Sequence, residues 1–173
     1  MAGSPGIPSL FTQRVVIGVG DLAVANQPAV TLSTYALGSC VGVVAYDPVA
    51  RAGGMLHLML PDSAIAPAKA TALPAMFADT GLPLLFRALA GLKADPARLR
   101  CFVAGGASVL NGPDAFKIGE RNVRATFDFL AAAGLVAPQP VVGGTSNRTL
   151  HLDIGTGLLT VKSPEGQTTR SLT

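Results

Sequence analysis

Two side chains in the first third of the chain, Cys40 and His57, are of the types that carry out nucleophilic catalysis. A cysteine hydrolase needs a thiolate, a base that generates it, and hydrogen-bond donors for the oxyanion that forms when the thiolate attacks a carbonyl. Cys40 follows Gly38-Ser39, a pair of small residues that exposes backbone N–H groups and lets a carbonyl approach closely. These residues predict a site at which Cys40 attacks a carbonyl carbon and His57 accepts the thiol proton.

The relative position of Cys40 and His57 depends on the hairpin that joins them. Residues 41–46 and 55–60 are β-branched or apolar runs bounded by turn residues, so each predicts a β-strand. A tight turn would place Cys40 directly opposite His57, with Cβ atoms about 5 Å apart on one face of the sheet. A longer turn shifts the pairing, and because side chains alternate with period two, the shift decides which face His57 occupies. The sequence leaves this register open.

Both residues also have a purely structural interpretation. Free cysteine is among the most often buried residue types, and a histidine between Leu56 and Leu58 is commonly a core residue. Cys101 lies in an apolar run and is expected to pack in the core, whereas His151 alternates with leucines and is expected on a strand surface. The Cys and His residues lack the short paired spacings of structural zinc sites, so no metal and no other cofactor is predicted.

The composition excludes several classes of protein. The chain has 173 residues, of which 49% are hydrophobic and 13% charged, so it is too apolar to be disordered and has the length of a single domain. No apolar run reaches the roughly 18 residues of a membrane-spanning helix, and residues 1–11 lack the features of a secretory signal. We therefore expect a cytoplasmic protein without membrane insertion. A net charge of +3 without a basic cluster argues against nucleic-acid binding.

The elements that must hold the candidate site are mainly strands. Amphipathic spacing predicts a helix near residues 79–91 and a second one between Gly119 and Gly134. Because strands and helices do not alternate strictly, the prediction is a single-domain, β-rich α+β layered sandwich with about two main helices. Residues 1–11 are expected to form a flexible lead-in, 12–163 the domain, and 164–173 a C-terminal tail. Further strands are expected at residues 14–19, 29–33, 99–104, 136–142, 149–154 and 158–161.

Several short motifs occur together in an order that is specific as a set. Their joint pattern, from about Val15 to Val161, resembles the CheD family, the chemoreceptor glutamine deamidases of bacterial chemotaxis. The motifs that carry the resemblance are Leu37-Gly38-Ser39-Cys40-Val41, Tyr46-Asp47-Pro48, the run from Gly53 to Pro61, Phe77-Ala78-Asp79-Thr80, Ala104-Gly105-Gly106-Ala107, Ile118-Gly119-Glu120-Arg121-Asn122, and Gly143-Gly144 with Arg148.

The resemblance implies a cysteine hydrolase that converts particular chemoreceptor glutamines to glutamates through a thioester intermediate. It leaves open a second activity, the hydrolysis of glutamyl methyl esters. It implies that Cys40, His57 and Thr34 form the catalytic triad, with Thr34 orienting the imidazole, although neighbouring Ser33 is a rival for that role. The implied fold is an α+β sandwich similar to the catalytic domain of cytotoxic necrotizing factor toxins.

The expected substrate contacts come from small residues. Backbone N–H groups at Gly38, Ser39 and Val41 are expected to hold the oxyanion. Gly105-Gly106 is expected to form a cleft wall that excludes water, although a sharp strand exit explains the same pair.

Two other functions stay open at this stage. One is a chemotaxis adaptor that acts mainly by binding chemoreceptor cytoplasmic domains and a CheC-type phosphatase. The other is a cysteine esterase or amidase with different substrates. The presence of Thr34, Cys40 and His57 together favours catalysis over a pure adaptor role.

Overall fold

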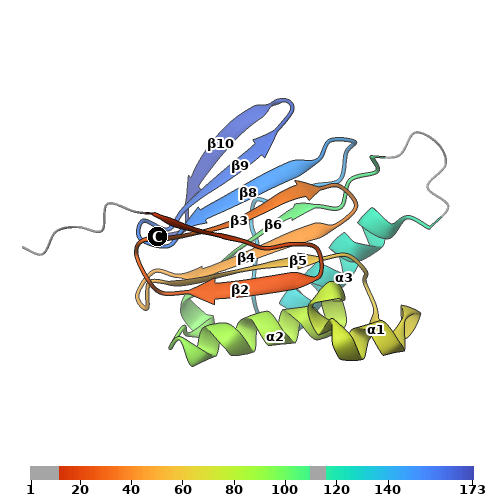
Figure 1. Ribbon diagram of the computed structural model, residues 1–173, viewed down its shortest axis with the longest axis horizontal. Coiled ribbons are helices and arrows are strands. Elements are labelled where there is room, and N and C mark those ends of the chain that lie inside the picture. Colours follow the sequence, from red (N-terminus) through yellow and green to blue (C-terminus); the bar gives the residue numbers. More distant parts are fainter. Residues whose placement is uncertain (1–11, 110–115) are drawn as a thin grey trace, which may run out of the picture.

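The computed structural model describes residues 12–109 and 116–173, which form three layers (Figure 1). Two five-stranded sheets pack face to face, and the helices cover the far face of one of them. We call the helix-covered sheet the central sheet and the other the outer sheet. The predicted α+β layered sandwich is confirmed, whereas the lead-in expected at residues 1–11 lies outside the described residues.

The outer sheet combines strands from the two ends of the chain. β1 and β3 run parallel, and all the other neighbours are antiparallel. Residues 164–173, expected as a tail, contain β10, which pairs with β9 along its whole length. Most β10 side chains are exposed and polar, so no apolar pattern marks the strand in the sequence. The order of strands is β1 (Gln13–Val16), β3 (Val30–Leu37), β8 (Arg148–Asp153), β9 (Leu158–Ser163) and β10 (Gly166–Ser171).

The central sheet has the predicted hairpin, β4 with β5, among its inner strands. Every residue of these two strands is buried. Val44 and Met55 pack in the core between the sheets, whereas Val43 and Leu56 pack in the core beneath the helices. Burial on both faces explains why these strands are apolar throughout instead of alternating with polar residues. The order of strands is β2 (Asp21–Ala25), β5 (Ala52–Leu58), β4 (Val41–Asp47), β6 (Arg100–Gly105) and β7 (Val141–Val142).

Two main helices cover the central sheet, as predicted. One face of α2, with Leu82, Leu85 and Leu89, is buried against the sheet. Phe129 of α3 stacks on Phe86 of α2, with 5.9 Å between ring centroids. No helix within the described ranges is long and apolar enough to span a membrane. The helices are α1 (Pro67–Ala72), α2 (Ala78–Gly91) and α3 (Ile118–Ala132), and short 3-10 turns are η1 (Ser63–Ile65), η2 (Pro74–Met76) and η3 (Pro96–Arg98).

Candidate active site

The connection between β3 and β4 carries the chain from the outer sheet to the central sheet, and Cys40 lies on it. The end of β3 contains a β-bulge between Thr34 and Leu37, where Ala36 has a φ of 55° in the left-handed region. A bulge bends its strand and re-aims side chains, which is why bulges are common beside active sites. This bulge turns the chain out of the outer sheet, and Cys40 follows it, half-buried, just before β4 begins.

His57 lies in β5 opposite Gly42 of β4, and not directly opposite Cys40. The tight-turn register is wrong by two residues because the hairpin turn is longer and comprises residues 48–51. Two residues is the side-chain period of a strand, so the shift preserves the face. His57 and Cys40 therefore share the side of the central sheet that faces the outer sheet, where Cys40 packs against the core between the sheets.

Thr34 and His57 meet between the two sheets, and both are buried. The hydroxyl oxygen Oγ1 of Thr34 lies 2.7 Å from Nδ1 of His57, and it donates its proton to the carbonyl oxygen of Ile17 at 2.7 Å. A hydroxyl has a single proton. Because Thr34 donates that proton to the carbonyl oxygen of Ile17, its own oxygen Oγ1 accepts the hydrogen of His57 Nδ1. The contacts thus select the tautomer that is protonated on Nδ1 and leave a lone pair on Nε2.

Burial keeps both His57 and Cys40 neutral. Desolvation lowers the pKa of His57 to about 4. Desolvation also raises the pKa of Cys40, and its own backbone N–H offsets part of that rise. Nε2 of His57 is buried and has no hydrogen-bond partner among the described residues, the Cys40 thiol included. The site therefore offers a neutral base with an unused lone pair and a neutral thiol, instead of an ion pair.

Ser33, the rival to Thr34, points to the opposite face of the outer sheet. Its Oγ lies 2.8 Å from Nδ1 of His151 in β8, and the half-buried His151 ring packs edge-on against Tyr35. Cys101 is buried beneath the helices, where desolvation raises its pKa to about 12. Within residues 12–109 and 116–173, no group of three or more Cys, His, Asp and Glu side chains is placed to hold a metal ion.

Cys40 lines a pocket of about 280 Å³ between the β3–β4 connection, the end of β5 and the start of α3. Large apolar side chains are exposed at this pocket: Met59 by 41%, Val109 by 45% and Phe116 by 74%. A mostly apolar pocket with one reactive group suits the entry of a single side chain from a larger substrate. The other lining residues are Ser39, Leu60, Ala107, Ser108 and Ile118.

Hydrogen bonds in the β3–β4 connection narrow the choice of oxyanion donors. The N–H of Gly38 donates to the carbonyl oxygen of Ala36 at 2.9 Å, and the N–H of Gly106 donates to that of Cys40 at 2.8 Å. Neither N–H is available to an oxyanion, so Gly38 and Gly106 do not fit that role. The N–H groups of Ser39 and Cys40 have no acceptor on another residue in the part of the chain that the structure describes.

Gly105 packs tightly against the backbone of Cys40, whereas Gly106 packs against α3 and bonds to Cys40 through its N–H. Gly105 has a φ of 108°, and a Cβ at this position would overlap the carbonyl oxygen of Cys40. Val41 lies opposite both Gly105 and Leu58, so its backbone belongs to the central sheet. The two glycines therefore hold the β3–β4 connection in place. Of the expected oxyanion donors only Ser39 remains, and the N–H of Cys40 is a second candidate.

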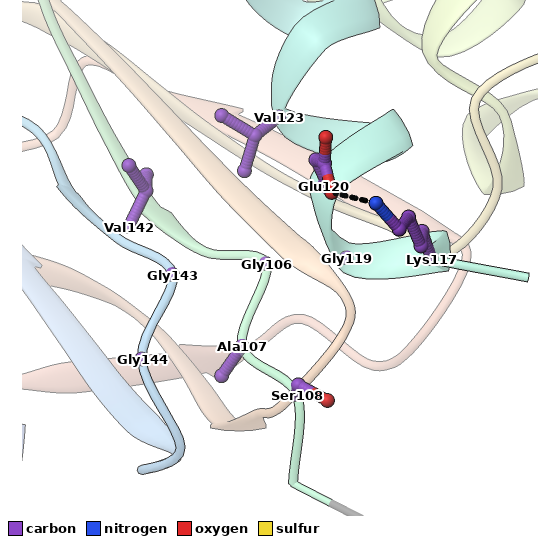
Figure 2. A pocket seen from close by; sticks show the side chains of 10 residues that line it. All are labelled: Gly106, Ala107, Ser108, Lys117, Gly119, Glu120, Val123, Val142, Gly143 and Gly144. Atoms are coloured by element: carbon purple, nitrogen blue, oxygen red, sulfur yellow. Dashed lines mark ion pairs between the residues drawn. The ribbon is translucent and has the colours of Figure 1, made fainter. Parts of the chain in front are cut away.

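A larger pocket of about 530 Å³ adjoins the first and shares Ala107 and Ser108 with it. Figure 2 shows it between the loop after β6, the segment after β7 and the first turn of α3. An ion pair of 3.6 Å between Lys117 and Glu120 lies at the α3 side. Backbone forms much of the wall, because four of the lining residues are Gly106, Gly119, Gly143 and Gly144.

Comparisons with known proteins show the family to which the chain belongs. Residues 59–163 match the family model described as CheD chemotactic sensory transduction. The chain belongs to the CheD family. It is 47% identical over 147 residues to the probable chemoreceptor glutamine deamidase CheD of Solibacter usitatus, covering 85% of this chain and 87% of the relative. It is 42% identical over 152 residues to the probable chemoreceptor glutamine deamidase CheD 1 of Syntrophus aciditrophicus, covering 88% and 95%.

Two solved structures are similar in part to this CheD chain. They are the hypothetical protein YfiH of Bacillus licheniformis, with a TM-score of 0.39 and 18% identity, and the protein NMB0706 of Neisseria meningitidis, with 0.43 and 16%. The first covers 78% of this chain and 60% of YfiH, and the second covers 76% and 59%. The expected likeness to cytotoxic necrotizing factor toxins stays a prediction.

Asn122 of the CheD chain, named above only as the last residue of a motif, is a buried polar residue beside the site to which the sequence assigned no role. Its Nδ2 donates to the carbonyl oxygens of Ser39 at 3.0 Å and of Met59 at 2.8 Å. Its Oδ1 is buried without a partner among the described residues. A signal was present in the sequence, because Asn122 falls between Gly119 and Thr126 at helical spacing on the buried face of α3.

Proposed function

We propose that this CheD chain is a cysteine hydrolase that converts glutamine side chains of chemoreceptors to glutamates. The curated relatives carry the name of this activity and align with most of the chain. The observation that carries the proposal is the hydrogen bond from His57 Nδ1 to Thr34, which leaves Nε2 as a base on the same side of the central sheet as Cys40. We place the reaction in the cytoplasm, where the free thiols of Cys40 and Cys101 stay reduced.

The first half of the proposed reaction forms a thioester. Nε2 of His57 accepts the proton of the Cys40 thiol, and the sulfur attacks the Cδ carbon of the substrate glutamine. The N–H groups of Ser39 and Cys40 hold the oxyanion of the tetrahedral intermediate. The His57 imidazolium then protonates the leaving amide nitrogen, so that the C–N bond breaks, ammonia departs and a γ-glutamyl thioester remains.

The second half regenerates the thiol. Neutral His57 accepts a proton from water through Nε2, and the oxygen of that water attacks the thioester carbon. The C–S bond breaks, the sulfur of Cys40 takes the proton from the imidazolium, and glutamate leaves. Because Thr34 accepts the hydrogen of Nδ1 throughout, the same nitrogen, Nε2, serves as base in both halves.

The direct test is deamidation of a chemoreceptor cytoplasmic fragment by the purified protein. Peptide mass spectrometry reports the mass gain that accompanies conversion of an amide to a carboxylate and locates the glutamine. We expect wild-type protein to modify particular glutamines and Cys40→Ala to modify none while still binding the fragment. Cys101→Ala is the matched control, because that thiol is buried away from the pocket and its removal should leave the modification intact. Deamidation by Cys40→Ala at the wild-type rate would contradict the mechanism.

The same chemistry extends to glutamyl methyl esters, because the corresponding tetrahedral intermediate expels methanol in place of ammonia and leaves the same γ-glutamyl thioester. Methylated receptor peptides in the same assay measure this second activity. The adaptor alternative makes a different prediction: the wild-type protein would bind receptor fragments and a CheC-type phosphatase but leave every glutamine unmodified.

A further inference from the structure

We propose that Asn122 is a positioning residue that orients the backbone N–H of Cys40 toward the oxyanion, a role that rests on the function proposed above. Asn122 lies on α3, outside the β3–β4 connection and outside the hairpin that carries His57. Its side-chain amide nevertheless bonds to both segments, through the carbonyl oxygens of Ser39 and Met59.

The bond to Ser39 determines which way the Cys40 N–H points. The carbonyl of Ser39 and the N–H of Cys40 belong to one planar trans peptide group, so they point in opposite directions. The Nδ2 group of Asn122 holds the carbonyl oxygen at 3.0 Å from one side. The N–H is therefore fixed toward the other side, where it has no acceptor on another described residue.

The second bond ties this peptide group to the strand of the base. Met59 follows directly after the end of β5, two residues beyond His57. Because one planar amide donates both of its hydrogens, to Ser39 and to Met59, it fixes the two segments relative to each other. On the other flank of the nucleophile, the N–H of Gly106 holds the carbonyl oxygen of Cys40 at 2.8 Å. Both peptide groups next to Cys40 are thus held by hydrogen bonds.

Two observations separate this role from ordinary core packing. The Oδ1 atom of Asn122 is buried without a partner among the described residues, which is unfavourable for a residue retained for stability alone. Thr126 lies one turn further along the same buried face of α3, but its hydroxyl bonds only to the carbonyl oxygen of Asn122 within the helix. Thr126 therefore provides a matched control: a buried polar side chain on the same helix that does not reach the site.

The test compares Asn122→Leu with Thr126→Val. Leu fills a similar space without donors, and we expect kcat for receptor deamidation to fall about tenfold to hundredfold with KM within about threefold, because the oxyanion forms only after substrate has bound. Thr126→Val should retain kcat. Loss of kcat in both variants to the same degree, or in neither, would overturn the proposal.

A second measurement does not depend on activity. The N–H groups of Gly106 and Ala107 donate to the carbonyl oxygens of Cys40 and Gly38. Their hydrogen exchange therefore reports how firmly the β3–β4 connection is held. We expect faster exchange at these two amides in Asn122→Leu and unchanged exchange in Thr126→Val. If the wild-type protein deamidates no receptor, the proposed function fails, and exchange alone decides whether Asn122 anchors this connection. Unchanged exchange in Asn122→Leu would then overturn the inference.

Asn122→Asp provides an independent variant in case the leucine does not fold. Asp keeps the size and shape of the side chain but replaces the two-hydrogen donor with an oxygen that faces the carbonyl oxygens of Ser39 and Met59. We expect the same fall in kcat and the same faster exchange at Gly106 and Ala107. Wild-type values of both in this variant would contradict the proposal.

Discussion

The hydroxyl of Thr34 has two hydrogen-bond neighbours but only one proton, and this determines which nitrogen of His57 carries a hydrogen. The proton goes to the carbonyl oxygen of Ile17, because a carbonyl can only accept, so the imidazole must supply the other hydrogen. A valine at this position would have the same shape and no hydroxyl. It would leave buried donors and acceptors unpaired and would release the preference for one tautomer.

Thr34→Val is therefore expected to lower kcat/KM for deamidation about 100-fold, since the base would no longer be held in the productive tautomer. Thr34→Ser retains the hydroxyl and should stay within about tenfold of wild type by the same reasoning. Steady-state kinetics on a receptor fragment gives both values, and circular dichroism confirms that each variant is folded. Equal activity of the valine and serine variants would show that the hydroxyl has no part in the reaction.

The pKa of His57 makes a second prediction about activity. Burial lowers this pKa to about 4, and only the neutral imidazole can accept the thiol proton, so activity is lost as the pH falls through that value. We expect kcat/KM to rise with pH around 4 and to be flat from about pH 5.5 upward. An exposed histidine would place the rise near its usual pKa of about 6.5. A rise near that higher pH, measured on protein shown to be folded, would contradict a buried neutral base.

At the scale of elements, the first turn of α3 packs directly on the loop that follows β6. A Cβ at Gly119 would lie 2.6 Å from the carbonyl oxygen of Gly106 and 2.9 Å from that of Ala107, closer than real Cβ contacts. Backbone atoms cannot move aside as a flexible side chain can. The glycine therefore sets how closely α3 approaches the loop after β6, and with it the distance over which Asn122 reaches the β3–β4 connection.

Gly119→Ala is expected to push α3 away from this loop and to lower both stability and activity. Overpacking of this kind costs about 1–3 kcal/mol in the free energy of unfolding, which urea denaturation measures. Gly91→Ala is the control, because nothing lies within 4 Å of a Cβ added at Gly91, near the end of α2. Its free energy of unfolding should stay within about 0.5 kcal/mol of the wild-type value. The prediction is wrong if the two alanine variants are equally stable and equally active.

The register of the β4–β5 hairpin shows how far the sequence determines an element. The two strands and their apolar faces were predictable, because burial on both sides leaves a continuous apolar pattern. The pairing of His57 was not, since the sequence does not determine whether residues 48–51 form a turn or continue the strands. The contact between Thr34 and His57 depends on how two sheets pack together, and no local pattern encodes that distance.

At the scale of the whole molecule, the last ten residues complete the outer sheet. Leu172 is buried in the core between the sheets, its N–H donates to the carbonyl oxygen of Gly157, and the Arg170 guanidinium lies 5.0 Å from the centre of the Phe102 ring. The segment looks like a tail in sequence because β10 is polar and forms an exposed edge of the outer sheet. Leu172 is the one buried side chain of this segment, and backbone pairing of β10 with β9 adds to its contribution to stability.

Removal of residues 164–173 is therefore expected to lower the free energy of unfolding by at least about 2 kcal/mol, the value of burying one leucine side chain. It would also leave β9 as an unprotected edge, which favours self-association. Chemical denaturation and analytical ultracentrifugation measure the two effects, and Leu172→Ala separates the packing loss from the edge effect. A truncated chain with full stability would mean that the segment is a tail after all.

The layered architecture was predictable because strand and helix periods are visible in the sequence, but the division of strands between sheets was not. β2 and β10 carry few buried residues, so they are hard to tell from turns and tails. Of the candidate site, Cys40 and His57 were singled out by residue type and motif, and Thr34 by the family resemblance. The bonds made by Asn122 were not predictable, because they join three separate segments.

Thr34 and His57 belong to different sheets. β3, which carries Thr34, pairs with β8, and β8 begins only at Arg148. A chain still being synthesised therefore carries Cys40 and His57 long before the outer sheet can form around Thr34. Until β8 pairs with β3, the outer sheet does not hold Thr34 against His57, and the hydrogen bond that selects one tautomer of the imidazole is not fixed. If His57 is the base, as proposed above, the site is completed only when β8 docks beside β3, so we expect a chain that lacks residues 148–173 to be a poor hydrolase.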